Sequence, residues 1–217
     1  MNIAVLFTRI ALAVVTLMGM NTVVYADLNS DILSIQQQWA RANYDTPGDA
    51  QEQAFEELVS DARELTDQWQ GKAEPLVWLA ISLSTDAGVN GGLSALGKVK
   101  EARKHLEAAK KIDATVLEGS VYTSLGSLYY QVPGWPIGFG DDDKAEAYLK
   151  KALAINPGGI DPNYFYGDFQ LEEGNYEVAE TYLTQASKAP ARPQRPLADK
   201  GRQAEIASKL EEVREKL

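Results

Sequence analysis

The sequence predicts an all-α fold in which pairs of antiparallel helices stack into a solenoid. Small residues recur at helical spacing between larger ones, and Ala145 and Ala179 hold equivalent places 34 positions apart. After residue 26, Ala, Leu, Glu, Lys and Gln are abundant and Val and Ile are sparse, which favours helices over strands. Because one helix pair cannot bury its apolar face alone, a pattern that recurs at this period indicates stacked pairs.

Nine helices are expected, since apolar residues recur at helical spacing between turn signals. The first is amphipathic, with Ile32, Ile35 and Trp39 on one side, and residues 45–49 form the turn that follows it. The third is apolar nearly all round, which places it at the centre of the core, and residues 88–92 are expected to form a long loop after it. The expected ranges are 28–43, 50–70, 74–86, 93–112, 116–131, 142–155, 162–173, 175–188 and 197–217.

Two glycines inside helices indicate close packing between the members of a pair. Gly126 and Gly167 lie in the first helix of their pairs, and Ala145 and Ala179 lie in the second. A glycine in a helix interior costs roughly 1 kcal/mol relative to alanine, so a close contact must offset that cost. The alternative is two ordinary amphipathic hairpins with chance glycines; agreement of spacing and residue size in two consecutive units favours the repeat.

This order of large, small and apolar residues resembles the tetratricopeptide repeat (TPR) family. The resemblance implies a right-handed TPR-like solenoid of about four helix pairs in a single domain, 27–217, with a capping helix at 197–217 over the open end. It is clearest over 116–157 and 161–190, and it departs from the family at Gln170 and Ala114, where Tyr and Pro are usual. The residues that carry it are Tyr122-x2-Leu125-Gly126-x2-Tyr129, Ala145-x3-Leu149-x2-Ala152 and Pro157, then Tyr166-Gly167, Ala179-x3-Leu183-x2-Ala186 and Pro190.

Residues 1–26 are typical of a secretory signal peptide. Arg9 is the only charge, residues 10–20 are mostly apolar, and Val24-Tyr25-Ala26 is close to an A-x-A cleavage pattern. The apolar run is short for a membrane span of about 20 residues, although an uncleaved anchor is the alternative. Cleavage after Ala26 and the absence of cysteine predict a periplasmic protein, or an extracellular one, with no stable membrane insertion.

An insertion between the fifth and sixth helices carries apolar side chains on a stiff backbone. Residues 131–141 hold two prolines and three glycines together with Trp135, Ile137 and Phe139. Solvent does not favour these three on a free loop, so Trp135 or Phe139 is expected to be substantially buried. The insertion then forms either a lid over the concave groove or a loop packed on its own helix pair. The same segment resembles one found in an uncharacterised group of exported bacterial TPR proteins.

Composition and motifs argue against catalysis. The chain has no cysteine and a single histidine, His105, and no nucleophile–base pair or phosphate loop is recognisable, so no enzyme and no cofactor are expected. Asp141-Asp142-Asp143 fit a helix N-cap better than a metal site. A net charge of −10 argues against nucleic acid as a partner. Pro190-x2-Pro193-x2-Pro196 is expected to be a rigid connector, with a proline-rich ligand motif as the alternative.

The predicted function is a soluble exported TPR scaffold that binds a protein or peptide in its concave groove. The alternative is a periplasmic small-ligand carrier of a transport system, because the helix layout is also weakly similar to the TPR subunit of tripartite (TRAP-type) periplasmic transporters. In TPR folds the first helix of each pair lines the groove, and the insertion adds aromatic residues. The resemblance thus implies a binding surface comprising Leu79, Leu83, Thr123, Ser127, Tyr130, Trp135, Phe139, Tyr164 and Asp168.

Overall fold

The computed structural model describes residues 27–217, and the predicted signal segment 1–26 lies outside this part of the chain. The predicted all-α fold is confirmed: within residues 27–217 the only β interaction is an isolated bridge between Gly134 and Gly140. The helices are α1 (Leu28–Tyr44), α2 (Ala50–Gln68), α3 (Ala73–Asn90), α4 (Gly92–Ile112), α5 (Val116–Gln131), α6 (Asp142–Ile155), α7 (Ile160–Glu172), α8 (Tyr176–Ser187) and α9 (Pro196–Arg214).

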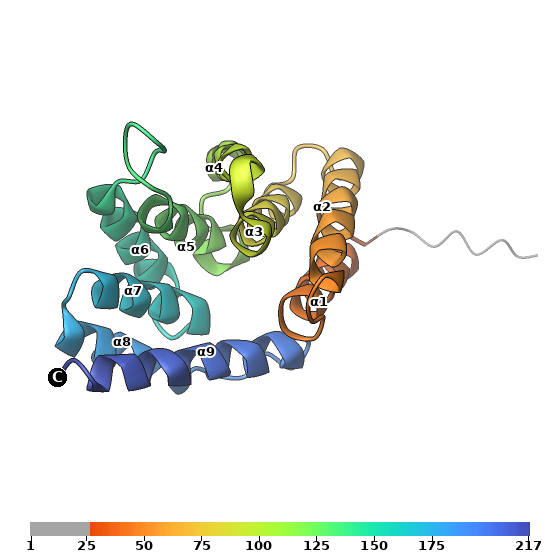
Figure 1. Ribbon diagram of the computed structural model, residues 1–217. Helices are drawn as coiled ribbons and strands as arrows, with labels where there is room; N and C mark the ends of the chain where they lie inside the picture. Colours follow the sequence, from red (N-terminus) through yellow and green to blue (C-terminus); the bar gives the residue numbers. More distant parts are fainter. Residues whose placement is uncertain (1–26) are drawn as a thin grey trace, which may run out of the picture.

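Consecutive helices pack as antiparallel pairs that follow an arc. Figure 1 shows α1/α2, α3/α4, α5/α6 and α7/α8 arranged around a curve, with α9 along its open side. The first helices of neighbouring pairs also touch one another, α1 with α3, α3 with α5 and α5 with α7. The predicted solenoid of four helix pairs is therefore present.

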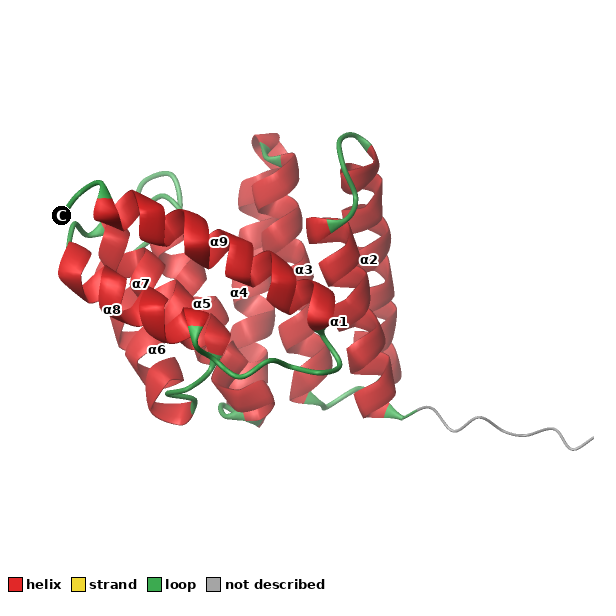
Figure 2. Ribbon diagram, turned by 90° about the horizontal axis from the view of Figure 1, so that it is seen from below, coloured by secondary structure: helices red, strands yellow, loops and turns green. Residues whose placement is uncertain are grey.

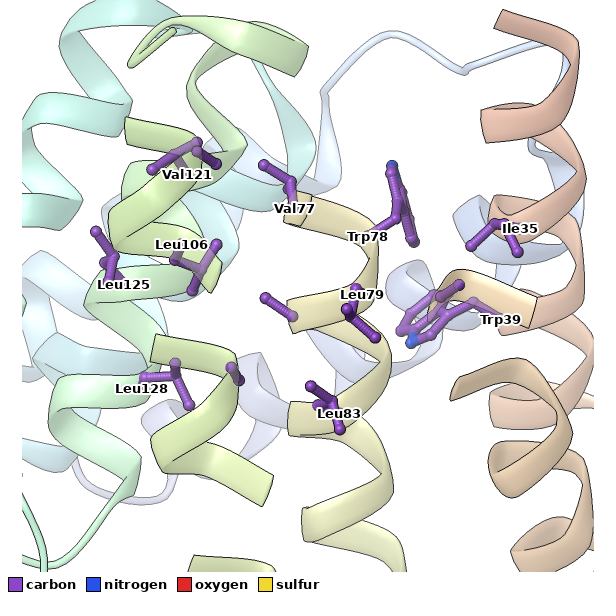
Figure 3. Close-up of a cluster of buried hydrophobic side chains, with 14 of the residues drawn as sticks. Ile35, Trp39, Val77, Trp78, Leu79, Leu83, Leu106, Val121, Leu125 and Leu128 are labelled. Carbon is purple, nitrogen blue, oxygen red and sulfur yellow. The ribbon is translucent and has the colours of Figure 1, made fainter. Parts of the chain in front are cut away.

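The centre of the core is α3, as its nearly continuous apolar sequence predicts. Val77, Leu79 and Leu83 are at most 1% exposed. Figure 3 shows Trp78 pointing from α3 towards Ile35 and Trp39 of α1, where the two indoles pack edge to face with centroids 6.3 Å apart. Burying side chains of this size stabilises the fold by roughly 1.5–3 kcal/mol each, which makes α3 the main source of cohesion between the first pairs.

Both predicted packing glycines lie at close contacts inside their pairs. A Cβ on Gly126 would lie 2.6 Å from Leu149 Cγ, and one on Gly167 would lie 2.8 Å from Leu183 Cγ and 3.0 Å from its backbone nitrogen. Real Cβ atoms do not approach other heavy atoms so closely, so only glycine lets these helices meet. The close contacts account for the glycines that helix propensity alone disfavours.

The expected long loop at 88–92 is wrong. Helix α3 continues to Asn90 and α4 begins at Gly92, so the chain reverses at a single residue. Gly91 has φ 55° and ψ −145°, and Gly92 has φ 71°, both in backbone regions that favour glycine. The consecutive glycines were a signal for a tight reversal, not for a loop.

The start of α5 is not a regular helix. Leu117, Glu118 and Gly119 have φ values of 51°, 56° and 82°, which form a left-handed turn before the regular helix. Non-glycine residues seldom adopt this conformation, so the two side chains are held there by their surroundings. The Glu118 carboxylate accepts a 3.0 Å hydrogen bond from the Asn156 amide, which ties the turn to the end of α6.

Helix α9 does more than cap the last pair. It packs on α8, as the sequence led us to expect, but it also contacts α7 and reaches α1. Figure 2, viewed from below, shows α9 crossing in front of α7 and α5 towards α1. In the N-terminal half of α9, Gly201 lies against Tyr44 of α1, and a Cβ on Gly201 would come within 2.4 Å of the Tyr44 ring. The last helix thus closes the open side of the arc.

The 131–141 insertion packs on its own helix pair and is not a lid. Figure 1 shows this loop between α5 and α6 on the side away from α9. Phe139 is half-buried, edge to face with Tyr129 and beneath the Arg103 guanidinium at 4.1 Å. Trp135 is 89% exposed, so the prediction that its ring is buried is wrong. Phe139 is partly buried, as the prediction allowed for either residue. Backbone hydrogen bonds from Gly140 to Pro133 and from Asp141 to Tyr129 fix the loop with the Trp135 ring outside.

Trp135→Ala is therefore expected to change the free energy of unfolding by less than about 0.5 kcal/mol, as surface substitutions usually do. Phe139→Ala, in the same loop, removes an aromatic pair and a cation–π contact and is expected to cost about 1–2 kcal/mol. Chemical denaturation of both variants measures the difference. Equal losses for the two variants would mean that the loop does not adopt this conformation.

Candidate functional site

The arc and α9 together enclose a hollow of about 340 Å³. A second hollow of about 590 Å³ lies beside it and shares Trp78, Ser120, Thr123, Asp161, Arg192 and Arg195. Side chains from α1, α3, α5 and α7, the first helix of every pair, form one wall. The connector 189–195 and α9 form the other wall, so the concave side is a partly closed cavity and not an open groove.

Ion pairs fasten the connector and α9 to α7. Asp161 at the start of α7 accepts hydrogen bonds from Arg192 at 2.7 Å and from Arg202 at 3.1 Å. Arg192 also pairs with Asp199 at 2.6 Å, and Arg202 with Glu205. Charge-assisted pairs of this kind are directional, so they fix the position of α9 over the cavity.

In the C-terminal half of α9, a hydrogen bond and an ion pair at Asp168 connect α5, α7 and α9. The Asp168 carboxylate of α7 accepts a 2.8 Å hydrogen bond from the Tyr130 hydroxyl of α5 and lies 2.9 Å from the Lys209 ammonium of α9. Burial, followed by the charge of Asp168, raises the pKa of Tyr130 well above its usual range. Tyr130 therefore remains a hydrogen-bond donor at neutral pH. These two residues support the wall of the cavity but are not among the residues that line it.

Arg202 is the most enclosed cation of α9. Its guanidinium lies 4.2 Å from the Tyr164 ring centroid and 4.8 Å from that of Phe165. Burial is also the main reason that the pKa of Tyr164 is raised, to about 12. Arg202 thus packs by stacking as well as by charge, which makes it part of the frame of the cavity.

Three hydrogen-bond donors at the cavity are buried without a well-formed hydrogen bond. Among the residues that the structure describes, Trp78 Nε1 and Arg195 Nε make no hydrogen bond, and the Tyr44 hydroxyl makes none of good geometry although the Glu205 carboxylate lies near it. All three residues line the 340 Å³ hollow. Burial raises the pKa of Tyr44, so its hydroxyl stays protonated at neutral pH. A buried polar group without a partner costs about 1–3 kcal/mol, so these donors favour an occupant that supplies acceptors.

Arg195 differs from the other two arginines of the cavity wall. It makes no ion pair with any residue in 27–217, and its guanidinium lies 5.2 Å from the Trp78 ring centroid. Burial first and then the charge of Arg192 lower the pKa of Arg195 below its usual value. Arginine nevertheless remains charged in proteins, so the cavity contains one positive charge that no neighbouring carboxylate pairs with.

The residues predicted from sequence are only partly brought together. Thr123, Ser127 and Tyr164 line the cavity, whereas Leu79 and Leu83 are 1% exposed and pack inside the core, where nothing outside can reach them. Tyr130 and Asp168 bond to each other behind the wall. The insertion that carries Trp135 and Phe139 lies on the side of the helix pairs away from α9 (Figure 1), and neither residue lines the cavity. Placing Leu79 and Leu83 at a binding surface is therefore wrong.

The sequence analysis did not identify Arg192, Arg195 and Arg202 as site residues, although they supply the positive charge of the cavity lining. Prolines flank the first two, and this pattern was assigned to a rigid connector. The connector does join α8 to α9, but its arginines face the cavity. Three arginines within eleven positions of an acidic chain were the available signal.

Asp161 is expected to make stability depend on pH. Burial alone would raise its pKa, but the charges of Arg202, Arg192 and Arg195 outweigh burial and lower the pKa to about 2. The unfolded pKa is 3.8, so the contribution is fully present above that pH and is lost as the pH falls towards 2. Asp161→Asn should cost about 2 kcal/mol at pH 6 and much less near pH 2. Urea unfolding across this range measures the gap between the two proteins; a gap that stays constant would contradict the pairing.

Comparisons with known proteins agree with this fold. A sequence profile of the tetratricopeptide repeat family matches residues 137–196, and no curated protein sequence matches the chain. The crystal structure of a thermophilic TPR protein from Thermus thermophilus is similar, with 16% identity and a TM-score of 0.53. The similarity covers 84% of this chain and 100% of that one. Residues 137–196 thus match the tetratricopeptide repeat, and residues 27–217 have an all-α repeat fold of TPR type, which is typical of protein-interaction scaffolds that generally do not catalyse reactions. The resemblance to the transporter subunit is not supported by these comparisons.

Two further findings concern the described residues. No helix in 27–217 has the length and hydropathy that crossing a bilayer requires. Nor does this part of the chain contain a group of three or more His, Asp or Glu residues arranged to hold a metal ion. Asp141 instead caps α6, where its carboxylate accepts a 3.0 Å hydrogen bond from the Lys144 backbone.

Proposed function

We propose that this protein binds a small organic molecule in the cavity between the arc of first helices and α9. The position of α9 is the observation that supports this function most strongly. It fills the concave side that an extended or helical peptide would otherwise need, and what it leaves is the hollow of about 340 Å³ with the adjoining one of about 590 Å³. Small-molecule sites usually measure about 300–1,000 Å³, so the remaining space suits a small ligand better than a peptide.

The lining also has the composition of a small-molecule site. Trp39, Trp78 and Ile81 contribute apolar surface to the lining, and Ser120 and Ser124 contribute hydroxyl groups, of which that of Ser120 already donates to the Leu117 carbonyl. Ligand sites usually combine an apolar wall with a few fixed polar groups. Walls built mainly from packed helices keep these groups in place, so little chain has to become ordered on binding.

Filling the cavity tests this proposal. Three probes of equal size, 4-phenylbutyrate, 4-phenylbutanamide and 4-phenylbutylamine, are added in turn to the exported protein and its melting temperature is measured. At least one should raise the melting temperature of the wild type and none that of Ser124→Trp, which places an indole in the hollow. Ser208→Trp, on the exposed side of α9, is the matched control and should respond like the wild type. No rise with any probe, or an equal rise in Ser124→Trp, would contradict the proposal.

Export to the periplasm is part of the same proposal. The apolar run before Ala26 supports it, as does the N-terminus of α1. Asp27 is the N-cap of this helix and accepts a 3.3 Å hydrogen bond from the Asn29 backbone, so cleavage after Ala26 leaves α1 complete. Intact-mass analysis of the exported protein should give a chain that begins at Asp27. A chain that retains Met1 in a membrane fraction would contradict it.

A protein partner is a second candidate function, and its support comes from the insertion. Trp135 and Ile137 are 89% and 67% exposed on a loop that backbone hydrogen bonds brace. Exposed tryptophan on a pre-ordered loop favours a protein with an apolar pocket, because binding then orders little chain. The adjoining Asp141, Asp142 and Asp143 argue against an anionic membrane as the partner. Pull-down by the wild type but not by Trp135→Ala would support this function, with Val178→Ala on α8 as the control.

A further inference from the structure

We propose that the ligand in this cavity is an organic monocarboxylate, with its carboxylate at Arg195 and its apolar body along the indoles of Trp39 and Trp78. This inference rests on the proposed small-ligand function and specifies its chemistry. It starts from the unequal partners of the three arginines. Arg192 and Arg202 each pair with two carboxylates, whereas Arg195 pairs with none in the described chain.

The unpaired donors call for an acceptor group. Arg195 Nε and Trp78 Nε1 are buried donors without partners on residues that line this cavity, and the Tyr44 hydroxyl, near the Glu205 carboxylate, is a third buried donor there. A carboxylate has two oxygens and about four acceptor positions, so it can accept from the Arg195 guanidinium and keep acceptor capacity for a neighbouring donor. A cationic ligand would leave the donors unpaired and would meet the Arg195 charge, which excludes amines as good ligands.

The neighbouring carboxylates limit the charge of the ligand. Asp161 and Glu205 line the same cavity, and both are already engaged by Arg192 or Arg202. A second negative charge on the ligand would lie near the Asp161 and Glu205 carboxylates, and no unpaired cation would be available to bind it. A single carboxylate therefore fits the charge of the site better than a dicarboxylate or a phosphate.

The indoles define the rest of the ligand. Trp78 and Trp39 are 4% and 7% exposed and their indoles pack edge to face, so the two residues expose only a narrow apolar strip to the cavity. The Trp39 Nε1 already donates to the Thr85 hydroxyl at 2.9 Å and needs no ligand. A hydrophobic tail or a small aromatic ring fits this strip.

The three phenylbutyl probes separate this inference from the proposed function. Isothermal titration calorimetry at pH 7 should show 4-phenylbutyrate binding the wild type at least about tenfold tighter than 4-phenylbutanamide, as a charge-assisted bond predicts. In Arg195→Gln this preference should disappear, and in Arg195→Lys it should persist in part. Arg214→Gln, which removes an exposed arginine from the C-terminal end of α9, should keep the full preference.

Stability is the second readout. Because Arg195 makes no ion pair among residues 27–217 and acts on Asp161 only after Arg202 and Arg192, Arg195→Gln should lower the urea midpoint much less than Asp161→Asn, whereas an arginine with a purely structural role would lower it comparably. Equal binding of acid and amide to the wild type overturns the inference, as does a preference for the amine or a preference that survives in Arg195→Gln. In these cases the small-ligand function stands. If none of the three probes binds, the proposed function fails and this inference fails with it.

Discussion

Replacing Gly201 by valine is expected to separate the first half of α9 from α1 and to open the cavity. A Cβ at this position would lie 2.4 Å from the Cδ1 and Cγ atoms of Tyr44, and valine adds two methyl groups beyond it. Overpacking of this kind costs about 1–3 kcal/mol, and the strain is relieved if α9 moves away. Amide hydrogen exchange should therefore become faster around Gly201 and in the last turn of α1.

The second half of α9 provides the internal control. Ile206, Leu210 and Val213 pack with α7 and α8 in a separate hydrophobic cluster, so their amides should keep their protection in Gly201→Val. Ala207→Val, which adds the same side chain at an exposed position of α9, should change neither exchange nor probe binding. Unchanged protection throughout Gly201→Val would mean that Gly201 does not contact α1 in solution.

Replacing Gly167 by alanine is expected to destabilise the last helix pair by about 1–3 kcal/mol. The added Cβ would lie 3.0 Å from the Leu183 backbone nitrogen, which cannot move without shifting α8. Gly97→Ala is the matched control, because Gly97 is also inside a helix but has open space around it. There alanine should stabilise by up to about 1 kcal/mol through helix propensity. Urea unfolding measures both changes, and a stabilising effect at Gly167 would refute the close-packing role.

The repeat architecture was predictable because its signals are local. Gly126 and Gly167 meet side chains of the next helix in the chain, at the fixed spacing that the repeat imposes. The path of α9 depends instead on a contact between Gly201 and Tyr44, which lie near opposite ends of the described chain. Helical periodicity identifies the apolar side of α9, but it does not identify α1 as the distant helix that α9 contacts. The sequence pattern could therefore predict only that α9 caps the last helix pair.

The candidate site was less predictable for a related reason. Thr123, Ser127 and Tyr164 follow from the repeat register, and they do line the cavity. Leu79 and Leu83 do not, because α3 is apolar on every side and its sequence does not fix which side faces inward. Trp135 is exposed because backbone hydrogen bonds fix the loop, which hydrophobicity alone cannot reveal.

The most direct test of the account is the distance between α1 and α9 in solution. The chain has no cysteine, so Arg41→Cys and Lys200→Cys place two spin labels at exposed positions close to the Tyr44–Gly201 contact. Pulsed electron paramagnetic resonance should give one narrow distribution of short distances, and the same pair in Gly201→Val should give a broader and longer one. A broad distribution at long distance in the wild-type background would contradict the closed cavity, and with it the ligand site that α9 completes.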